Sequence, residues 1–267
     1  MKVFEAFKFA INFLDSKIIA KELLKFHLKL DDNNFLLNFD EKLSFKDDFI
    51  ELLKRYKNGE PLEYITKRCE FFGDEFYIEK GVLIPRFETE ILVENVLEIA
   101  QNFQNPKICE IGFGSGIISL TLKKHLKNCE ILATDISKKA LKIAKKNALN
   151  FDLEVEFLNT SLMDGVCGNF DIIVSNPPYI KNSYKIDKWV ANEPKEALFG
   201  GENGDEILKD IIKLAKNRAK FLACEIGYDQ KNSMQNELIN SNFEAIFYKD
   251  LAGFDRGFIA KNRTFDD

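Results

Sequence analysis

From Lys107 onward the chain alternates short apolar runs with helical patterns, and no other feature of the sequence constrains the fold as strongly. The apolar runs cover residues 108–111, 131–134, 155–158, 172–175 and 221–226. Such alternation predicts a mostly parallel sheet with helices on both faces. Two further runs, 243–248 and 258–261, leave no room for a helix between them, so they predict an antiparallel hairpin at the C-terminus. The fold class is therefore α/β and Rossmann-like.

A glycine-rich loop follows the first of these runs and opens a helix. Gly112, Gly114 and Gly116 lie within the run EIGFGSG, where the missing side chains let the backbone turn sharply and approach a ligand. The third glycine stands one position too early for a dinucleotide fingerprint, which disfavours a dehydrogenase. Asp135 ends the next run, where a carboxylate can accept both hydroxyl groups of a ribose. Asp135 can also cap the helix that begins near Ser137, and the two roles are compatible.

A second motif, Asn176-Pro177-Pro178-Tyr179, stands directly after the fourth predicted strand. Because ligands of open parallel sheets bind outside the carboxyl ends of the strands, the tetrapeptide is expected to face the same crevice as the glycine loop. The Asn176 side-chain oxygen and the Pro177 carbonyl can each accept one proton of a planar NH₂ group. The two prolines stiffen the loop, and Tyr179 can cover the flat group.

This tetrapeptide predicts methylation of a planar, amide-type nitrogen, with Asn176, Pro177 and Tyr179 as the catalytic residues. An amide nitrogen is a poor nucleophile because its lone pair is delocalised into the carbonyl. Holding both of its protons turns the lone pair toward a methyl donor, and positioning of this kind contributes about 7–11 kcal/mol. No strong base is required, since the methylated nitrogen is acidic enough to lose its proton to water.

Composition and charge narrow the class of protein. The net charge is −5, whereas a protein that binds a nucleic-acid backbone usually carries a basic surplus. The two histidines and five scattered cysteines, with no CxxC pair, predict no metal site and reduced thiols. The N-terminus lacks the pattern of a signal peptide, and no apolar run approaches the roughly 18 residues of a membrane span. We therefore expect a cytoplasmic protein without a membrane partner.

The N-terminal part of the chain has a different organisation. Residues 1 to about 60 show apolar positions at helical spacing, which predicts a small helical unit. A hairpin is expected over residues 69–78, with its turn at Gly73-Asp74, and a helix over residues 88–103. We divide the chain into a helical domain over residues 1–66, a hairpin linker over 67–81 and a methyltransferase domain over 82–267. The residues alone leave open whether the helical domain is a structural cap or a module that recognises a partner.

The chain resembles the HemK-type (PrmC) release factor glutamine methyltransferases, which have the class I methyltransferase fold, because the same motifs follow one another in the same order. The resemblance extends over nearly the whole chain. Besides the glycine loop, Asp135 and the tetrapeptide, it rests on Pro61-Leu62-Glu63-Tyr64-Ile65, on LIPRFETE at 83–90 and on the stretch from Glu193-Pro194 to Gly200-Gly201.

The resemblance implies the substrates. S-adenosylmethionine would be the cofactor, with S-adenosylhomocysteine as its product, and the acceptor would be the glutamine side chain in the Gly-Gly-Gln motif of peptide chain release factors. It further implies that the N-terminal helices help to bind the release factor. Apart from the resemblance, we expect a monomer, and the acidic net charge predicts no stable nucleic-acid partner.

The resemblance also implies roles for particular residues. The residues expected to hold the cofactor are Gly112, Phe113, Gly114, Ser115, Gly116, Asp135, Leu162 and Asn176. The residues expected to bind the substrate are Arg86, Asn176, Pro177, Pro178 and Tyr179.

Some positions depart from the family pattern or allow two interpretations. Phe87 replaces the second proline of the family's IPRPETE stretch, and Phe113 occupies a loop position that is usually small or hydroxylated. Ser161-Leu162 stands where the family has an acidic residue beside an aromatic one, so the adenine contact falls to Ser161, Leu162 or Asp164. Arg86 can steer the substrate or pair with an acid such as Glu88 or Glu90. The loop over Gly200–Gly204 can be a mobile lid, or Asn203 and Glu206 can cap the helix that follows it.

Three other functions fit parts of the pattern. The same tetrapeptide occurs in enzymes that methylate exocyclic amines of DNA or RNA bases, which would need a basic groove and usually base flipping. A sister class methylates a glutamine of a ribosomal protein, although Glu88-Thr89-Glu90 after Pro85-Arg86 fits the release-factor branch better. A cofactor-binding scaffold that has lost catalysis is the third alternative, and the intact tetrapeptide argues against it.

Overall fold

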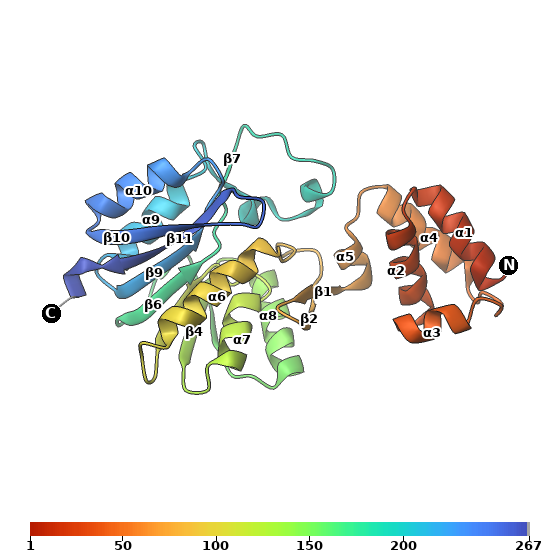
Figure 1. Cartoon of the computed structure of the whole chain (residues 1–267), viewed down its shortest axis with the longest axis horizontal. Coiled ribbons are helices and arrows are strands. Elements are labelled where there is room, and N and C mark those ends of the chain that lie inside the picture. The colour runs from red at the N-terminus through yellow and green to blue at the C-terminus, as the bar shows by residue number, and fades with distance from the viewer. Residues whose placement is uncertain (266–267) are drawn as a thin grey trace. The chain divides into compact units, whose positions relative to one another are not determined.

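The computed structural model describes residues 1–265, and these fall into two compact units. Unit 1 comprises Met1–Arg68 together with the short segment Asp187–Asn192, and unit 2 comprises Cys69–Ile186 and the chain from Glu193 onward. Figure 1 colours the chain from red at its N-terminus to blue at its C-terminus, so that unit 1 is red to orange apart from that short segment. The functional division into recognition domain, linker and methyltransferase domain stays a prediction, because compactness does not define a role.

Unit 1 is built from short helices around an aromatic core. Its helices are α1 Val3–Leu14, α2 Lys17–Leu28, α3 Asp32–Leu37, α4 Lys46–Lys57 and α5 Leu62–Thr66. The Ser16 hydroxyl caps α2 by accepting a hydrogen bond from the Ile19 N–H. The Phe35 ring lies edge-on to both Phe7 and Phe39, with centroids 5.4 and 5.2 Å apart. These contacts bury the apolar stripes that the helical spacing predicts.

The segment 187–192 packs within unit 1 although it is distant in sequence from the other residues of that unit. The Trp189 ring lies 4.5 Å from the Tyr56 ring, centroid to centroid, and the Asn192 side chain donates a hydrogen bond to the Gly59 carbonyl over 2.8 Å. The 3₁₀ turn η1, Val190–Asn192, belongs to this segment. Unit 1 is therefore not continuous in sequence.

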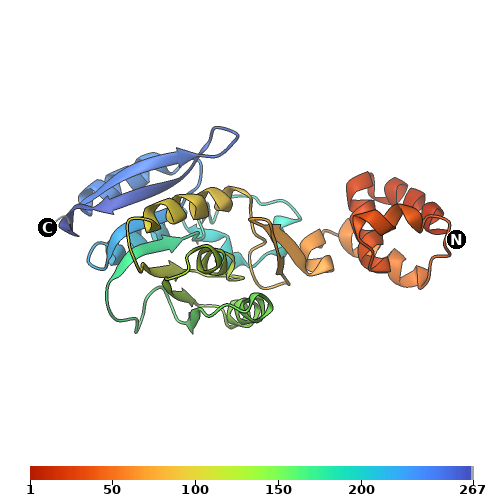
Figure 2. The same ribbon diagram turned by 60° about the horizontal axis from the view of Figure 1, so that its bottom comes forward.

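A seven-stranded sheet forms the centre of unit 2. Its strands are β3 Lys107–Ile111, β4 Glu130–Asp135, β5 Glu156–Asn159, β6 Phe170–Ser175, β9 Ala219–Glu225, β10 Phe243–Lys249 and β11 Asp255–Asn262. Their spatial order is β10-β11-β9-β6-β3-β4-β5. The pairs β9–β6, β6–β3, β3–β4 and β4–β5 are parallel, whereas β11 runs antiparallel to both β9 and β10. Figure 2 shows β10 and β11 (blue) as a hairpin at one edge of this sheet, which confirms the predicted fold class.

Helices cover both faces of the sheet. They are α6 Glu88–Ala100, α7 Ile117–His125, α8 Lys138–Phe151, α9 Glu206–Ala215 and α10 Lys231–Asn240. The apolar faces of α9 and α10 pack in one core with alternate residues of the strands, such as Cys109 and Ile173. Because successive strand residues point to opposite faces, their neighbours face the other layer, which contains α6, α7 and α8.

The direction of chain winding reverses between β3 and β6. From β3 the chain passes outward to β4 and β5, and it then crosses to β6 on the other side of β3. Crevices open at the carboxyl ends of strands where the winding reverses in this way. The glycine loop leaves the end of β3, and the tetrapeptide that begins at Asn176 leaves the end of β6. The fold therefore brings the two predicted motifs to the same crevice.

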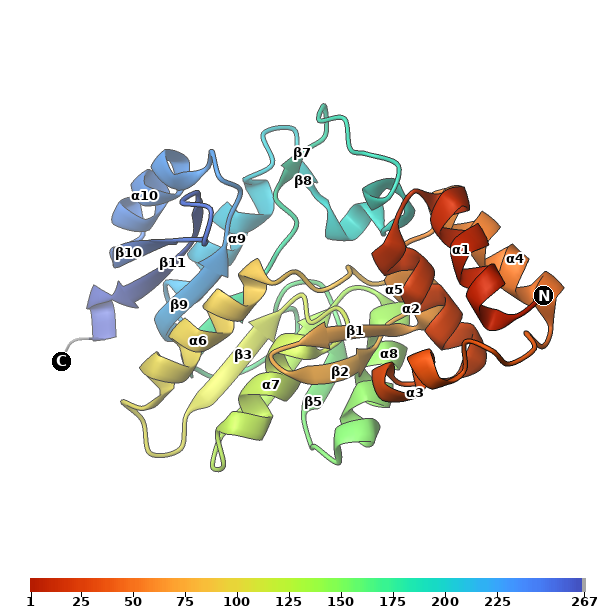
Figure 3. The same cartoon turned by 45° about the vertical axis from the view of Figure 1, so that its right-hand side comes forward.

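Two small sheets lie outside the large one (Figure 3). The hairpin expected over residues 69–78 is present as β1 Arg68–Phe71 and β2 Asp74–Tyr77. The other pair is β7 Ile180–Lys181 and β8 Phe199–Gly201, which run parallel. The remaining 3₁₀ turns are η2 Lys195–Ala197 and η3 Arg263–Phe265. Within residues 1–265 no helix combines the length and apolarity needed to cross a bilayer.

Candidate active site

A pocket of about 310 Å³ opens in unit 2 at the reversal between β3 and β6. This volume falls in the range of small-molecule sites. The predicted site residues that line it are Arg86, Gly112, Phe113, Gly114, Ser115, Asp135, Leu162, Asn176, Pro177 and Pro178. Among the residues described, Gly116 and Tyr179 do not line it. Gly116 instead begins α7, where a Cβ atom would meet Ala144 and Phe157 at 3.1 and 3.3 Å, so its role is to let helix and strand pack closely.

The glycine loop is open toward the pocket. Gly112 and Gly114 have φ angles of 81° and 52°, and a Cβ atom built on either glycine would meet nothing within 4 Å. Their backbone conformation, rather than crowding, therefore requires glycine. The N–H groups of Gly112 and Phe113 both donate to the Thr134 carbonyl, at 2.7 and 3.2 Å, and this fixes the loop on the end of β4.

Asp135 holds the glycine loop from the neighbouring strand. Its Oδ2 accepts a hydrogen bond from the Gly114 N–H over 2.8 Å, and its Oδ1 accepts one from the Ser137 N–H over 2.7 Å. Burial raises the pKa of this carboxyl, and the two backbone donors oppose that rise. The cap of α8 is Ser137, whose hydroxyl accepts from the Ala140 N–H, so the alternative of a cap by Asp135 is not observed. Each Asp135 oxygen keeps acceptor capacity for a ligand hydroxyl.

Glu110 is a pocket residue that we did not predict as part of the site. It is the last residue but one of β3, just before the glycine loop, and it is only 1% exposed. Its Oε2 accepts hydrogen bonds from the Ser119 N–H and hydroxyl, whereas Oε1 is buried without a hydrogen-bond partner in the described chain. Burial raises the pKa of Glu110 to about 8. A buried, unpaired acceptor beside a glycine cradle fits a ligand that brings N–H donors. A carboxylate directly before the glycine loop is the signal that sequence analysis could have used.

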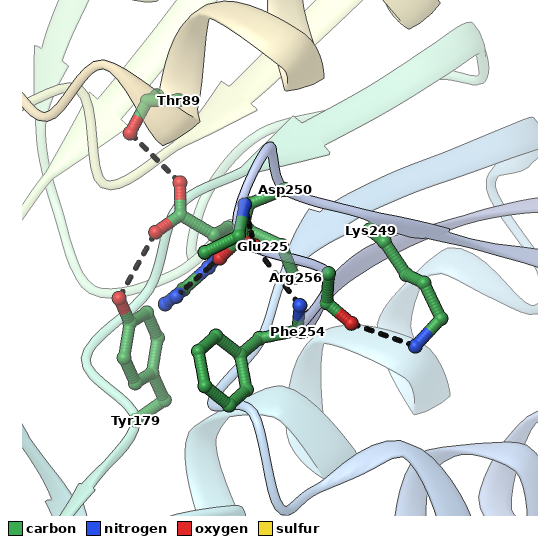
Figure 4. Close-up of polar contacts among 9 residues, drawn as sticks. Thr89, Tyr179, Glu225, Lys249, Asp250, Phe254 and Arg256 are labelled. Carbon is green, nitrogen blue, oxygen red and sulfur yellow. Dashed lines mark hydrogen bonds and ion pairs between the residues drawn. The ribbon is translucent and has the colours of Figure 1, made fainter.

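The tetrapeptide leaves β6 at a point that is tied to β3, because the Ser175 hydroxyl donates to the Ile111 carbonyl over 2.6 Å. The Asn176 amide nitrogen donates to the Thr89 hydroxyl over 3.0 Å, which leaves its side-chain oxygen as a free acceptor. The Tyr179 hydroxyl donates to Glu225 Oε1 over 2.9 Å, as Figure 4 shows. Burial raises the pKa of Tyr179, so this tyrosine stays protonated.

The segment Gly200–Gly204 packs against the backbone of the tetrapeptide. A Cβ atom on Gly204 would approach the Tyr179 carbonyl to 2.6 Å, and one on Gly200 would collide with the Pro178 carbonyl. The Gln230 side chain donates to the Tyr179 and Gly204 carbonyls at 3.0 and 2.9 Å, which joins the two segments.

The same segment leads into α9, for which the sequence suggested a cap by Asn203 and Glu206. Glu206 Oε1 accepts a hydrogen bond from the Asn203 N–H over 2.9 Å, but the N-cap of α9 is Asp205, which makes no side-chain capping bond, so the predicted cap by Asn203 and Glu206 is not observed. Gly200 and Gly201 belong to β8, which pairs with β7 directly after the tetrapeptide. This loop therefore packs directly against the backbone of the tetrapeptide.

Arg86 forms an ion pair that differs from the predicted ones. Its Nη2 lies 2.5 Å from Glu193 Oε1, and its Nη1 donates to the Ile84 carbonyl over 2.9 Å. The prediction that Arg86 pairs with an acid is therefore confirmed, with Glu193 as a partner that the sequence did not suggest. Glu193 is 107 residues away in sequence, so no local pattern indicates it. Arg86 also lines the pocket, and its role toward the substrate stays a prediction.

Of the three candidates for the adenine contact, two line the pocket. Ser161 and Leu162 line the pocket, whereas Asp164 is not among the described lining residues. Leu162 has a φ angle of 45°, a left-handed conformation that is uncommon for leucine. Groups of three or more histidine, cysteine, aspartate or glutamate side chains able to hold a metal ion are absent from residues 1–265.

Two family models match separate parts of the chain, one in the N-terminal helical unit and one in the sheet-containing unit. The family described as Methyltransferase small domain matches residues 87–198, and the PrmC N-terminal domain matches residues 5–66. A release factor glutamine methyltransferase of Clostridium acetobutylicum is 39% identical, and the alignment covers 92% of this chain and 90% of that protein. The release factor glutamine methyltransferase of Koribacter versatilis is 34% identical over 99% of this chain and 100% of its own length.

Solved structures share the fold at much lower identity. A ribosomal protein L11 methylase from Lactobacillus delbrueckii subsp. bulgaricus has a TM-score of 0.53 at 22% identity, over 73% of this chain and 89% of that one. The 16S rRNA N2 G1207 methyltransferase of Thermus thermophilus, in complex with AdoMet and guanosine, has a TM-score of 0.55 at 15% identity, over 73% and 50% of the two chains. At these identities the similarity concerns the methyltransferase fold alone.

Proposed function

Because the chain belongs to the family of release factor glutamine methyltransferases, we propose that it methylates the glutamine of the Gly-Gly-Gln motif in a peptide chain release factor. The methyl donor is S-adenosylmethionine, in keeping with its methyltransferase domain. The observation that carries the proposal is the orientation of Asn176, whose side-chain oxygen is left free to accept beside Pro177 in the pocket.

Several groups of this chain are suited to hold the cofactor. The open backbone at Gly112 and Gly114 allows close approach of a ligand, and the Asp135 carboxylate has acceptor capacity for ribose hydroxyls. The unpaired Glu110 oxygen suits the amino group of the methionine part. Phe113, Ser115 and Leu162 complete the walls. The bound cofactor supplies an electrophilic methyl group on a sulfonium sulfur.

The tetrapeptide orients the acceptor. The Asn176 oxygen accepts one N–H of the glutamine amide, and the Pro177 carbonyl accepts the other. With both protons held, the lone pair of the nitrogen points toward the methyl group. A bond forms between that nitrogen and the methyl carbon, and the bond from carbon to sulfur breaks. The nitrogen then loses a proton to water, so a strong base is unnecessary.

Tyr179 keeps the covering role that its motif suggests, and a hydrogen bond of its hydroxyl fixes the ring. Its hydroxyl is engaged with Glu225, so its ring is held in place. We propose that this ring covers the flat acceptor group and that Pro178 forms part of the same wall. We propose that Arg86, which lines the pocket and pairs with Glu193, contacts the substrate from this fixed position.

Unit 1 is proposed to bind the release factor outside its acceptor loop. The match of residues 5–66 to the PrmC N-terminal domain supports this role over that of a structural cap. Release factors act on ribosomes, so we place the reaction in the cytoplasm. The similarity to an rRNA methyltransferase concerns the fold alone and does not favour methylation of an exocyclic amine.

In the test, the purified chain is incubated with a release factor and with S-adenosylmethionine that carries a labelled methyl group. The control is the same release factor with the glutamine of its Gly-Gly-Gln motif changed to alanine. We expect label on the first factor and not on the second. Equal labelling of both factors would place the methyl group elsewhere. If neither factor is labelled while the cofactor still binds, the acceptor is a different molecule, such as a ribosomal protein.

A further inference from the structure

Thr89 and Glu225 connect to Asn176 through a continuous series of hydrogen bonds. Thr89 lies in the first turn of α6 and Glu225 at the end of β9, 136 residues apart in sequence. The Thr89 hydroxyl donates to Glu225 Oε2 over 2.7 Å, and the Asn176 amide nitrogen donates to the Thr89 oxygen over 3.0 Å. Tyr179 donates to the other Glu225 oxygen. Figure 4 shows Glu225 between the two hydroxyl groups.

The direction of these hydrogen bonds is determined by Glu225. A carboxylate accepts and cannot donate, so the single proton of the Thr89 hydroxyl is committed to Glu225. Thr89 can then interact with Asn176 only as an acceptor. Asn176 must therefore present its NH₂ group to Thr89, and its carbonyl oxygen takes the opposite direction. The two ends of an amide have nearly the same shape, so packing alone does not select this orientation.

Two hydroxyl groups donate to Glu225, one to each of its oxygens. The side chain is buried, which raises the pKa of Glu225, and the hydrogen bonds from Thr89 and Tyr179 and the charge of Arg256 oppose that rise. Arg256 is itself fixed by Asp250, whose Oδ2 lies 2.7 Å from the Arg256 Nη2. Burial of Thr89 and Glu225 keeps competing water away from the hydrogen bond between them.

We propose that Thr89 and Glu225 are positioning residues, which fix the Asn176 amide with its oxygen toward the acceptor glutamine. This inference rests on the proposed function, since it assumes that Asn176 receives the glutamine amide. Without the Thr89 hydroxyl the Asn176 amide is free to turn over. A reversed amide presents N–H donors to the N–H donors of the substrate, so the acceptor nitrogen is no longer oriented.

The experiment compares three threonine variants. Thr89→Val removes the hydroxyl at nearly constant volume, and Thr89→Ser retains it. Thr121→Val is the matched control, because Thr121 is equally buried but its hydroxyl has no partner in the described chain and does not line the pocket. We measure kcat and KM for the release factor, the Kd of S-adenosylmethionine and the Tm of each variant.

We expect Thr89→Val to lower kcat by about tenfold to a hundredfold, with the cofactor Kd within about twofold of the unmodified chain. Thr89→Ser should recover most of the rate, and Thr121→Val should keep it. If Thr89→Val does not fold, Thr89→Ala replaces it, since the smaller side chain introduces no strain. A kcat for the hydroxyl-free variant equal to that of Thr121→Val would overturn the proposal.

A double-mutant cycle tests whether Thr89 acts through Asn176. In an Asn176→Ala background the Thr89→Val change should have little further effect on kcat, because no amide remains to be oriented. If the two losses multiply, Thr89 acts independently of Asn176 and the proposal fails. A failure of the proposed function is recognised separately, because the unmodified chain would then place no label on the release factor.

Discussion

The backbone N–H of Gly114 donates a hydrogen bond of 2.8 Å to Oδ2 of Asp135, which joins the tip of the glycine loop to the end of β4. One side chain therefore shapes the loop and also has acceptor capacity toward the pocket. The Ser137 N–H, which binds the other oxygen, keeps the carboxylate from rotating. This arrangement is the basis of the first prediction.

Replacing Asp135 with alanine should weaken cofactor binding while the chain remains folded. The change removes the ribose acceptors and releases the Gly114 N–H from its partner. Hydrogen bonds to charged groups contribute about 1.5–3 kcal/mol, which predicts a rise in the S-adenosylmethionine Kd of at least about tenfold by calorimetry. Asp164→Ala, near Leu162 but outside the described pocket lining, serves as control and should bind normally. A stronger effect of Asp164→Ala than of Asp135→Ala would reverse our assignment.

Asn176→Ala should abolish turnover and spare the cofactor. The variant removes the acceptor that holds one amide proton, so kcat should fall well below about a tenth of the original value. The cofactor Kd should change little. Asn182→Ala, an exposed position just beyond β7, is the control. Retention of more than a tenth of the rate by Asn176→Ala would contradict the positioning argument.

Glu110 should make stability depend on pH. Burial raises its pKa from 4.5 to about 8 in the folded chain, so between these values the folded state binds a proton that the unfolded state has released. The contribution of this group is therefore fully present below about pH 4.5 and is lost as the pH rises toward about 8. Glu110→Gln should show a smaller decline in the free energy of unfolding, measured by urea denaturation across this range. Glu130→Gln, at the exposed start of β4, is the control, and a slope for Glu110→Gln that matches it would refute the assignment.

Asn147 should be important for stability rather than for chemistry. Its side chain accepts from the Tyr77 N–H over 2.8 Å and donates to the Tyr77 and Ser115 carbonyls at 3.0 and 2.9 Å. It thereby links β2 to the glycine loop from within α8. Asn147→Ala leaves these buried backbone groups unpaired and should cost about 2–4 kcal/mol of unfolding free energy. Asn150→Ala, on the exposed side of the same helix, should cost less than about 0.5 kcal/mol. Equal denaturation midpoints for the two variants would show that solvent satisfies the freed groups.

Local patterns in the sequence predict much of the fold. The central strands β6 and β9 form from runs that are buried over consecutive residues. The C-terminal hairpin follows because the stretch between its two apolar runs is too short for a helix. The positions of the glycine loop and of Asn176 follow from general rules about parallel sheets, once β3 and β6 are recognised. Each of these features depends on residues that are close together in the sequence, so local patterns are sufficient to predict it.

The contacts that orient the site depend on residues far apart in sequence. Arg86 pairs with Glu193 instead of a neighbour in α6, and Thr89 reaches Glu225 across 136 residues. No periodicity or spacing marks such pairs, because they arise from the crossing of separate elements. The partner of Tyr179 is another such contact, because nothing in the tetrapeptide indicates that its hydroxyl donates to Glu225. The return of residues 187–192 to unit 1 was likewise not visible in the sequence.

The most direct test of the account locates the methyl group itself. A release factor is incubated with S-adenosylmethionine and either the unmodified chain or Asn176→Ala, and fragment-ion mass spectrometry then identifies the modified atom. We predict one added methyl group on the side-chain amide of the Gly-Gly-Gln glutamine with the unmodified chain, and almost none with the variant. A methyl group on any other residue, or equal modification by the two proteins, would contradict the central claim.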